Sequence, residues 1–284
     1  MSAGSNFRNQ VTSNIGSLKN TGIELAMSWK ALQTKDWYWT IDYNFTYNEN
    51  KITELIGGDD KDYYIPTGGI SAGTGNTCQA HAVGHAASSF LVYQQAYDKN
   101  GMPLEGVLVD RDGNGVINES DKYYYKNPMA PVTMGLSSRL EYKNFDLGFA
   151  LRASIGNYVF NDQMAGSSNI SKAAMWRQDK FSQNRPVAVL PYKWASDDEK
   201  SVLSDRYVQN GSFLKMDNVT LGYSFANLLR GANYGGISGR IYGSVTNVFT
   251  ITKYKGIDPE VFGGIDNNIY PRPITFQLGL TLNF

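Results

Sequence analysis

The sequence predicts an all-β protein, an antiparallel transmembrane β-barrel segment of about nine strands with long extracellular loops. Three observations predict this fold: long segments of alternating apolar and polar residues, short turns that join some of these segments, and many aromatic residues. Successive side chains of a strand point to opposite faces, so alternation creates one apolar face and one polar face. The 284-residue chain contains 19 Tyr, 13 Phe and 5 Trp, side chains that are enriched at membrane interfaces.

The alternation is clearest at the end of the chain, where apolar residues from Phe276 to Phe284 alternate with small or polar ones. A half-buried strand of a soluble sandwich would show the same pattern, so length has to decide. Segments 37–48 and 132–142 alternate over the roughly 9–11 residues that a tilted strand needs to cross a bilayer, whereas ordinary strands average about five or six. Charged residues such as Arg139 and Glu141 lie on the polar face, which suits a water-filled lumen.

The pattern predicts strands near 20–32, 37–51, 77–84, 87–97, 132–142, 145–157, 212–226, 237–249 and 274–284. Short turns follow at 33–36 and at Lys143-Asn144, and both have hairpin chemistry. The connections 98–131, 158–211 and 250–273 are long. Short turns on one side and long loops on the other are typical of outer-membrane barrels. If Phe284 is periplasmic, the short turns are periplasmic too and the long loops are extracellular.

The composition excludes several classes of protein. The formal net charge is zero, which argues against a nucleic-acid surface. Cys78 is the sole cysteine, so neither a disulfide framework nor a cysteine metal cluster is expected. No apolar run approaches the roughly 18 residues of a transmembrane helix. Within 158–211, helical turns are expected at 173–181 and after a cap at Ser196.

The most specific chemical motif is the segment 110–121, with the sequence DRDGNGVINESD. It follows the calcium-loop template D-x-[DN]-x-[DN]-G with an acid at position twelve. Ca²⁺ prefers six to eight hard oxygen ligands. The expected ligands are the side chains or carbonyl oxygens of Asp110, Asp112, Asn114, Val116, Asn118 (through water) and Asp121. A polar turn rich in Asp, Asn and Gly for backbone reasons is the alternative, and any ion would stiffen an external loop.

Other candidate sites lack the context that their chemistry needs. Residues 69–73 match the G-x-S-x-G nucleophile elbow, but a flexible Gly-rich loop surrounds Ser71 instead of a strand and a helix. His81 and His85 have the spacing of a helical zinc pair, yet their flanks are strand-like. We therefore expect no enzyme activity. The long loops contain the aromatic residues Trp176, Trp194 and Tyr207. They either stack on sugar rings or cover a partner; the alternative is that they pack within the loop.

Three segments carry a family resemblance. Residues 20–25 (NTGIEL), 213–223 (FLKMDNVTLGY) and 247–260 (NVFTITKYKGIDPE) resemble, in order, segments of the SusC/RagA-type TonB-dependent transporters of Bacteroidetes. Residues 270–273 (YPRP) depart from the family's Y-P-x-x-R order, so no role is assigned to Arg272. The resemblance runs from about residue 14 to residue 284.

The resemblance implies that the chain is the C-terminal part, over residues 1–284, of an outer-membrane importer of an oligosaccharide or a peptide. Such transporters have about 22 strands around a plugged lumen, so the plug and the first half of the barrel would lie upstream. It also implies a SusD-like surface lipoprotein and TonB as partners. One alternative is a self-contained small barrel that acts as a passive pore or a phospholipase-like enzyme. Another is a structural or adhesive surface sheet.

Overall fold

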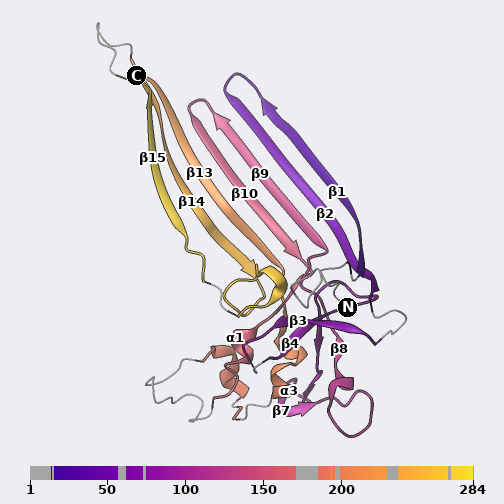
Figure 1. Ribbon diagram of the computed structural model, residues 1–284. Helices are drawn as coiled ribbons and strands as arrows, with labels where there is room; N and C mark the ends of the chain where they lie inside the picture. Colours follow the sequence, from indigo (N-terminus) through magenta and orange to yellow (C-terminus); the bar gives the residue numbers. More distant parts are fainter. Residues whose placement is uncertain are drawn as a thin grey trace, which may run out of the picture.

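Within the described residues, seven strands form one antiparallel sheet in the order β1-β2-β9-β10-β13-β14-β15 (Figure 1). The computed structural model describes residues 14, 16–56, 62–72, 75–170, 185–192, 194–195, 199–228, 236–267 and 270–283. The strands of this main sheet are β1 (Gly16–Gln33), β2 (Trp37–Leu55), β9 (Val132–Tyr142), β10 (Phe145–Ile155), β13 (Phe213–Leu228), β14 (Ile237–Thr252) and β15 (Thr275–Asn283). Each has a counterpart among the strands predicted from the sequence.

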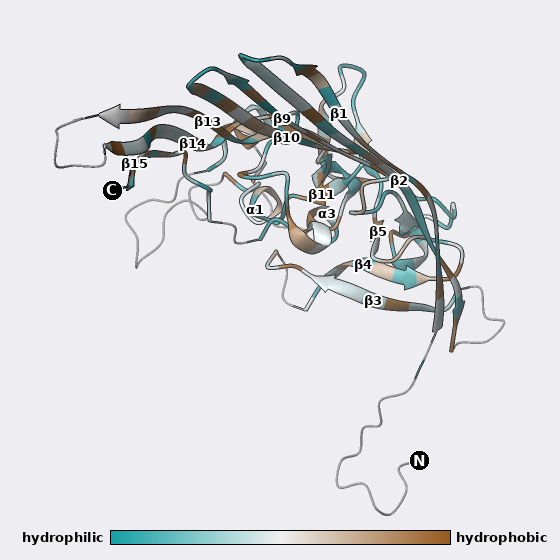
Figure 2. Cartoon of the chain, turned by 90° about the horizontal axis from the view of Figure 1, so that it is seen from above, coloured by the Kyte–Doolittle hydropathy of each residue, from teal (hydrophilic) through white to brown (hydrophobic). Residues whose placement is uncertain are grey.

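The remaining elements form a second part, the loop layer, at the end of the sheet away from the short turns (Figure 1). Its strands are β3 (Tyr64–Gly69), β4 (Thr77–Ala82), β5 (Ser89–Val92), β6 (Gln95–Tyr97), β7 (Pro103–Leu108), β8 (Tyr123–Tyr124), β11 (Tyr158–Phe160) and β12 (Val208–Asn210). Its helical turns are η1 (Glu119–Asp121), α1 (Asp162–Ala165), η2 (Val187–Tyr192), α3 (Glu199–Val202) and η3 (Asp205–Tyr207), and η4 (Phe262–Gly264) follows β14. In end view the main sheet curves, and these elements are seen on its concave side (Figure 2).

The expectation of about nine strands in the barrel wall is wrong for two of them. The predicted strands 77–84 and 87–97 correspond to β4, β5 and β6, which pair within small sheets of the loop layer. They are too short to cross a bilayer, because β4 has six residues and β5 has four against the roughly 9–11 that are needed. The connection from β2 to β9 is therefore one long excursion. Long and short connections still alternate along the main sheet.

The register fixes which side chains share a face. Arg139, Gly148 and Thr220 lie opposite one another on β9, β10 and β13, on the polar face that we call the inner face. On the other face, Trp37 pairs with Tyr142, and Phe145 lies between Tyr142 and Tyr223. These four aromatics form a continuous row beside the short turns, with ring centroids 4.2 Å apart for Trp37–Tyr142 and 4.8 Å for Phe145–Tyr223. Such a row is typical of a membrane interface.

The hydrophobic core lies in the loop layer, not in the main sheet. Phe90, Val92 and Phe160 are fully buried there, together with Cys78 and Tyr207. The outward residues of the main sheet are exposed instead, for example Leu278 at 82%. This division is expected where lipid, and not protein, covers one face of a sheet.

None of the short helices in the described part of the chain has the length and apolar content needed to span a membrane. Three expectations fall outside the described residues: the helix at 173–181, the cap at Ser196 and the placement of Phe284. Helix α3 does begin at Glu199, close to where a helical turn was expected.

Candidate functional site

Two cations face each other on the inner face of the main sheet. Arg152 of β10 lies directly opposite Lys215 of β13, although like charges at opposed positions repel each other. The side chain of Lys215 is only 3% exposed, so water does little to screen this repulsion. Carboxylates must therefore compensate for both cations.

The carboxylates come from β13 and from the segment between β14 and β15. Asp217 accepts a hydrogen bond from Arg152 Nε at 2.7 Å. Glu260 accepts from both Nη atoms of Arg152, with Nη2 2.7 Å from Oε2. Lys215 Nζ lies 2.8 Å from Asp258 Oδ1 and 3.1 Å from Glu260 Oε2. The DPE segment thus folds back onto the inner face.

Arg272 adds a third cation to this group. Its Nη1 lies 2.6 Å from Glu260 Oε2, and its Nε lies 3.4 Å from Asp258 Oδ2. We call the six residues the ion clamp: Arg152, Lys215, Arg272, Asp217, Asp258 and Glu260. With three cations and three carboxylates, its formal charge is zero.

Glu260 is the centre of the clamp because all three cations bind it. Burial favours the neutral acid, but the hydrogen bonds from Arg152 and Lys215 outweigh burial and lower the pKa of Glu260 to about 2. The carboxylate is therefore ionised at any physiological pH.

A cavity of about 510 Å³ lies beside the clamp, between the inner face and the segment that follows β14. Polar residues Thr133, Ser154 and Asn157 and aromatic residues Phe213 and Phe262 line it, along with Arg152 and Arg272. A mixed lining of this kind and a volume within about 300–1,000 Å³ are typical of small-molecule sites.

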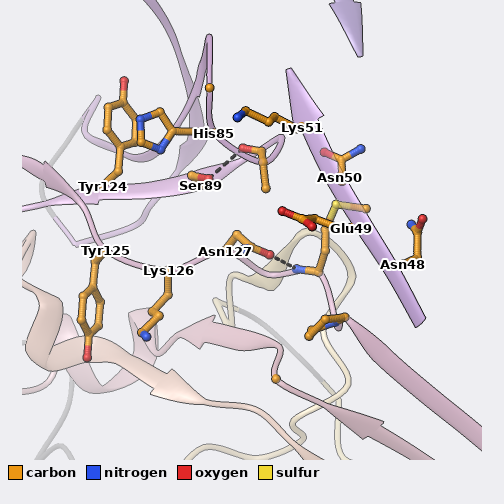
Figure 3. Close-up of a pocket in the computed structure, with 15 residues that line it drawn as sticks. Asn48, Glu49, Asn50, Lys51, His85, Ser89, Tyr124, Tyr125, Lys126 and Asn127 are labelled. Carbon is orange, nitrogen blue, oxygen red and sulfur yellow. Dashed lines mark hydrogen bonds between the residues drawn. The ribbon is translucent and has the colours of Figure 1, made fainter. Parts of the chain in front are cut away.

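A second cavity of about 330 Å³ lies between the end of β2 and the loop layer (Figure 3). Glu49, Lys51 and Lys126 place charged groups around it. The ring of His85 stacks on Tyr124 at a centroid distance of 3.8 Å. Burial, together with the nearby Lys51, lowers the pKa of His85, which favours the neutral imidazole. This rim cavity is polar and aromatic, and it suits a ligand with many hydrogen-bonding groups.

The predicted calcium loop brings its carboxylates together. Ligand atoms of Asp110, Asp112 and Asp121 lie within 4.8 Å of one another. Asp110 accepts hydrogen bonds from the backbone N–H groups of Gly113 and Gly115, each at 2.7 Å. Gly115 has a φ of 80°, a backbone conformation that suits glycine. This convergence of hard oxygen atoms fits a divalent cation.

The other three predicted ligands sit differently around the loop. Asn114 Oδ1 accepts from the backbone N–H of Val116 at 2.8 Å. The Val116 carbonyl accepts from Asn118 Nδ2 at 3.2 Å. Asn118 Oδ1 caps the helical turn η1 through Ser120 N at 2.8 Å. Asp121 is fully buried, and backbone hydrogen bonds, above all from Asn118, lower its pKa.

The rejected catalytic motifs have structural partners. Ser71 donates its hydroxyl to Asp162 Oδ2 at 2.5 Å, and the Ser71 backbone N–H donates to the same oxygen. His81 Nδ1 accepts from the backbone N–H of Ser88 at 3.0 Å. These contacts tie loops together, because the Asp162 carboxylate also accepts a hydrogen bond from the backbone N–H of Ala72.

Two of the loop aromatics pack inside the loop layer. Trp194 is 4% exposed and Tyr207 is 1% exposed, and the guanidinium of Arg206 lies over the Trp194 ring at 4.0 Å. They are therefore not free to stack on a ligand. Trp176 lies outside the described residues.

The ion clamp was not predicted from the sequence, although a signal for it exists. Five of its six members occur within the three blocks FLKMDN (213–218), DPE (258–260) and YPRP (270–273), each of which contains charged residues. Arg152 lies on β10, outside these blocks, and nothing in the sequence around it indicates its part in the clamp. Only the strand register places Arg152 beside Lys215.

Comparisons with known proteins relate the chain to a group of receptors. It is 50% identical over 282 residues to the TonB-dependent receptor SusC of Bacteroides thetaiotaomicron, covering 99% of this chain and 28% of SusC. It is 29% identical over 307 residues to TonB-dependent receptor P3 of Formosa agariphila, covering 95% of this chain and 29% of that protein. No protein-family model matches the chain.

Solved structures have the same fold over this region. A structure of the RagAB peptide importer in the closed-closed state matches with a TM-score of 0.72 and 27% identity, covering 95% of this chain and 30% of that one. A structure of the RagAB peptide transporter matches with a TM-score of 0.71 and 26% identity. The chain thus spans less than a third of the length of these relatives.

Proposed function

We propose that this chain belongs to the SusC/RagA type of TonB-dependent receptor and forms the C-terminal part of an outer-membrane barrel that imports an oligosaccharide or peptide nutrient. The observation that carries this proposal is the 50% identity to SusC over 99% of the chain. The seven-stranded sheet with an apolar outer face and a charged inner face supports it. A barrel of this type must use its inner face for passage.

The proposed barrel includes more strands than this chain provides. In the described residues, β1 and β15 lie at opposite edges of the main sheet and do not pair with each other. Unpaired edges are costly in lipid, so we propose that further strands and a plug complete the barrel. The short turns would face the periplasm and the loop layer would face outward. A SusD-like lipoprotein and TonB would be the partners.

Cell fractionation and uptake test this proposal. An antibody raised against residues 250–273 should detect, in outer membranes, a protein several-fold heavier than this chain. Growth on the imported nutrient should be lost when either that protein or TonB is deleted. A membrane band at the mass of this chain alone, with TonB-independent uptake, would favour the passive pore or phospholipase-like enzyme.

We also propose that the segment 110–121 binds Ca²⁺ and that the ion is structural. The support is the match to the calcium-loop template and the convergence of the Asp110, Asp112 and Asp121 carboxylates within 4.8 Å. A bound cation would neutralise these carboxylates and hold the loop between β7 and β8 in one conformation.

A further inference from the structure

The turn between β4 and β5, residues 83–88, attaches the loop layer to β2. The Ile52 backbone N–H donates to His85 O at 2.8 Å, and the Gly84 backbone N–H donates to Ile52 O at 2.9 Å. The side chain of Asn50, also on β2, accepts a third hydrogen bond from a backbone N–H of this turn at 2.9 Å. These three hydrogen bonds join the β4–β5 turn to a strand of the main sheet.

The sequence contains two histidines, and both belong to this region. His81 lies near the end of β4, and His85 lies within the β4–β5 turn. Histidine is the side chain whose ordinary pKa, about 6.5, places its change of charge between pH 5 and pH 8. In this chain, imidazole titration is therefore confined to the turn and the strand end before it.

His81 holds the turn through a hydrogen bond that only a neutral imidazole can accept. Its Nδ1 accepts from the Ser88 backbone N–H at 3.0 Å. Ser88 has a φ of 58°, in the left-handed region that residues other than glycine rarely adopt, and this hydrogen bond helps to offset the cost. Both ring nitrogens of an imidazolium carry protons. Protonation of His81 therefore replaces the acceptor with a second donor facing the Ser88 N–H.

His85 lies in surroundings that disfavour its cationic form. Its ring stacks on Tyr124 of β8 at a centroid distance of 3.8 Å (Figure 3). Burial, followed by the positive charge of Lys51 on β2, lowers the pKa of His85. Glu49 and Lys126 are the other charged residues that line the cavity beside this ring. A proton on His85 would thus add a partly buried charge next to a lysine.

The strands on either side of β4 supply no charge that would stabilise an imidazolium. On β3, Ile65 lies opposite His81, and the neighbouring Tyr64 carries a phenol. Strand β5 (Ser89–Val92) contains no ionisable side chain. Asp62, which precedes β3, acts on the hydroxyl of Tyr124. Within the described part of the chain, neither histidine forms an ion pair with a carboxylate.

We propose that protonation of His81 and His85 releases the β4–β5 turn from β2, so that acid weakens the attachment of the loop layer to the main sheet. A histidine that is held neutral in the attached turn binds a proton mainly after release, so release becomes more favourable as the pH falls below about 6.5. Gly84 and Ala86 of the turn also line the cavity of about 330 Å³ shown in Figure 3. Release of the turn therefore changes the shape of that cavity.

Hydrogen exchange of the complete receptor in detergent tests this inference. Protection of peptides covering 50–54 and 83–90 is compared at pH 7.5 and pH 5.0, after correction for the intrinsic effect of pH on exchange. Protection should fall by about thirtyfold if one histidine is excluded from protonation in the attached turn, since pH 5.0 lies about 1.5 units below the ordinary histidine pKa. The β9–β10 hairpin, residues 132–155, contains no histidine and should keep its protection. Equal protection of the turn at both pH values, or an equal fall in the hairpin, would overturn the inference.

Two substitutions separate the histidines from other titrating groups. His81→Asn keeps an acceptor for the Ser88 N–H at every pH, because asparagine Oδ1 and histidine Nδ1 are the same number of bonds from the backbone. His85→Phe keeps a ring on Tyr124 without a site for a proton. Each single variant should show a smaller fall in protection than the unchanged receptor, and the double variant should stay constant within about threefold. A full fall in these variants would overturn the inference.

Glu49→Gln is the matched control, because it removes an ionisable group that lines the same cavity and leaves both histidines in place. Its protection should fall with pH as in the unchanged receptor, and a fall abolished by this change alone would overturn the role of the histidines. Hydrogen exchange requires neither TonB nor a nutrient. The release of the turn and the import proposal can therefore fail independently.

Discussion

Arg152 and Lys215 lie directly opposite each other on neighbouring strands, and both carry a positive charge. Opposed like charges destabilise a sheet, so this pair persists because Asp217, Asp258 and Glu260 surround it. Two of these carboxylates, Asp258 and Glu260, belong to the connection between β14 and β15. The two cations thus bind carboxylates of a connecting segment and attach that segment to the sheet.

Lys215→Met should destabilise the complete receptor by about 2–4 kcal/mol, because breaking a buried ion pair leaves an unpaired charge. Asp258, which is 6% exposed, would keep the hydrogen bond from the Glu260 backbone N–H but only the longer ion pair, with Arg272. Heat-modifiability of the folded barrel on gels measures the change. Lys99→Met, at an exposed turn, should change stability by less than about 0.5 kcal/mol. Equal losses for the two variants would contradict a buried clamp.

The clamp should be insensitive to pH across the physiological range. The pKa of Glu260 lies at about 2, below its ordinary value of 4.5. A depressed acid pKa stabilises the folded state fully above the ordinary value, and this contribution is lost as the pH falls from 4.5 to 2. Protection of residues 253–267 against hydrogen exchange should therefore be constant from about pH 5 to 8. Loss of this protection between about pH 5 and 7 would show that a group other than Glu260 controls the position of the segment.

If residues 110–121 bind Ca²⁺, substitution of a ligand carboxylate should weaken Ca²⁺ binding, whereas substitution of a neighbouring acid that is not a ligand should not. Calorimetry on the chelator-treated receptor should show Ca²⁺ binding. Asp112→Asn should weaken the affinity by about tenfold or more, because it removes one charged ligand. Glu119→Gln is the control, since Glu119 lies in the same segment but pairs with Lys122. An equal effect of both changes, or the absence of binding, would contradict the site.

Gly279 accommodates a ring from the neighbouring strand. Gly279 lies directly opposite Tyr242, and a Cβ atom there would overlap the tyrosine ring. Gly279→Ala should therefore cost about 1–3 kcal/mol through overpacking, and Tyr242→Ala in the same chain should recover part of this loss. Gly243→Ala is the control, because the nearest atom to its Cβ would be 4.0 Å away. Equal heat resistance of G279A and G243A barrels would rule out the overlap.

The aromatic row beside the short turns should anchor the barrel in the membrane interface. Trp37→Ala removes the 4.2 Å contact with Tyr142, and it should lower barrel stability by about 1–2 kcal/mol. Tyr142→Phe keeps the ring and should behave almost like the unchanged protein. Denaturant unfolding from lipid vesicles measures both variants. A larger loss for Tyr142→Phe would indicate that the hydroxyl, and not the ring, matters.

Sequence periodicity predicts the main sheet well, because a sheet with one apolar face and one polar face requires alternation along every strand. The seven long strands of the main sheet and the turn at Lys143-Asn144 are confirmed by the register. Periodicity fails for 77–84 and 87–97, because the sequence of a short strand of the loop layer resembles that of a short stretch of a main-sheet strand. Periodicity also cannot reveal the ion clamp, because its residues lie between positions 152 and 272 of the sequence. They meet only because β10 pairs with β13 and the segment after β14 folds back onto the sheet.

The neutrality of the ion clamp has a consequence for how related receptors diverge. Its six residues come from two strands and from the connection between β14 and β15, so each can be substituted independently at the level of the gene. Yet the loss of one charge leaves a partly buried ion without its counterion. Substitutions should therefore accumulate in compensating sets, with loss of Glu260 accompanied by loss of Arg152 or Arg272. Such correlated replacements would allow the connection between β14 and β15 to be aligned among distant family members even where its other residues differ.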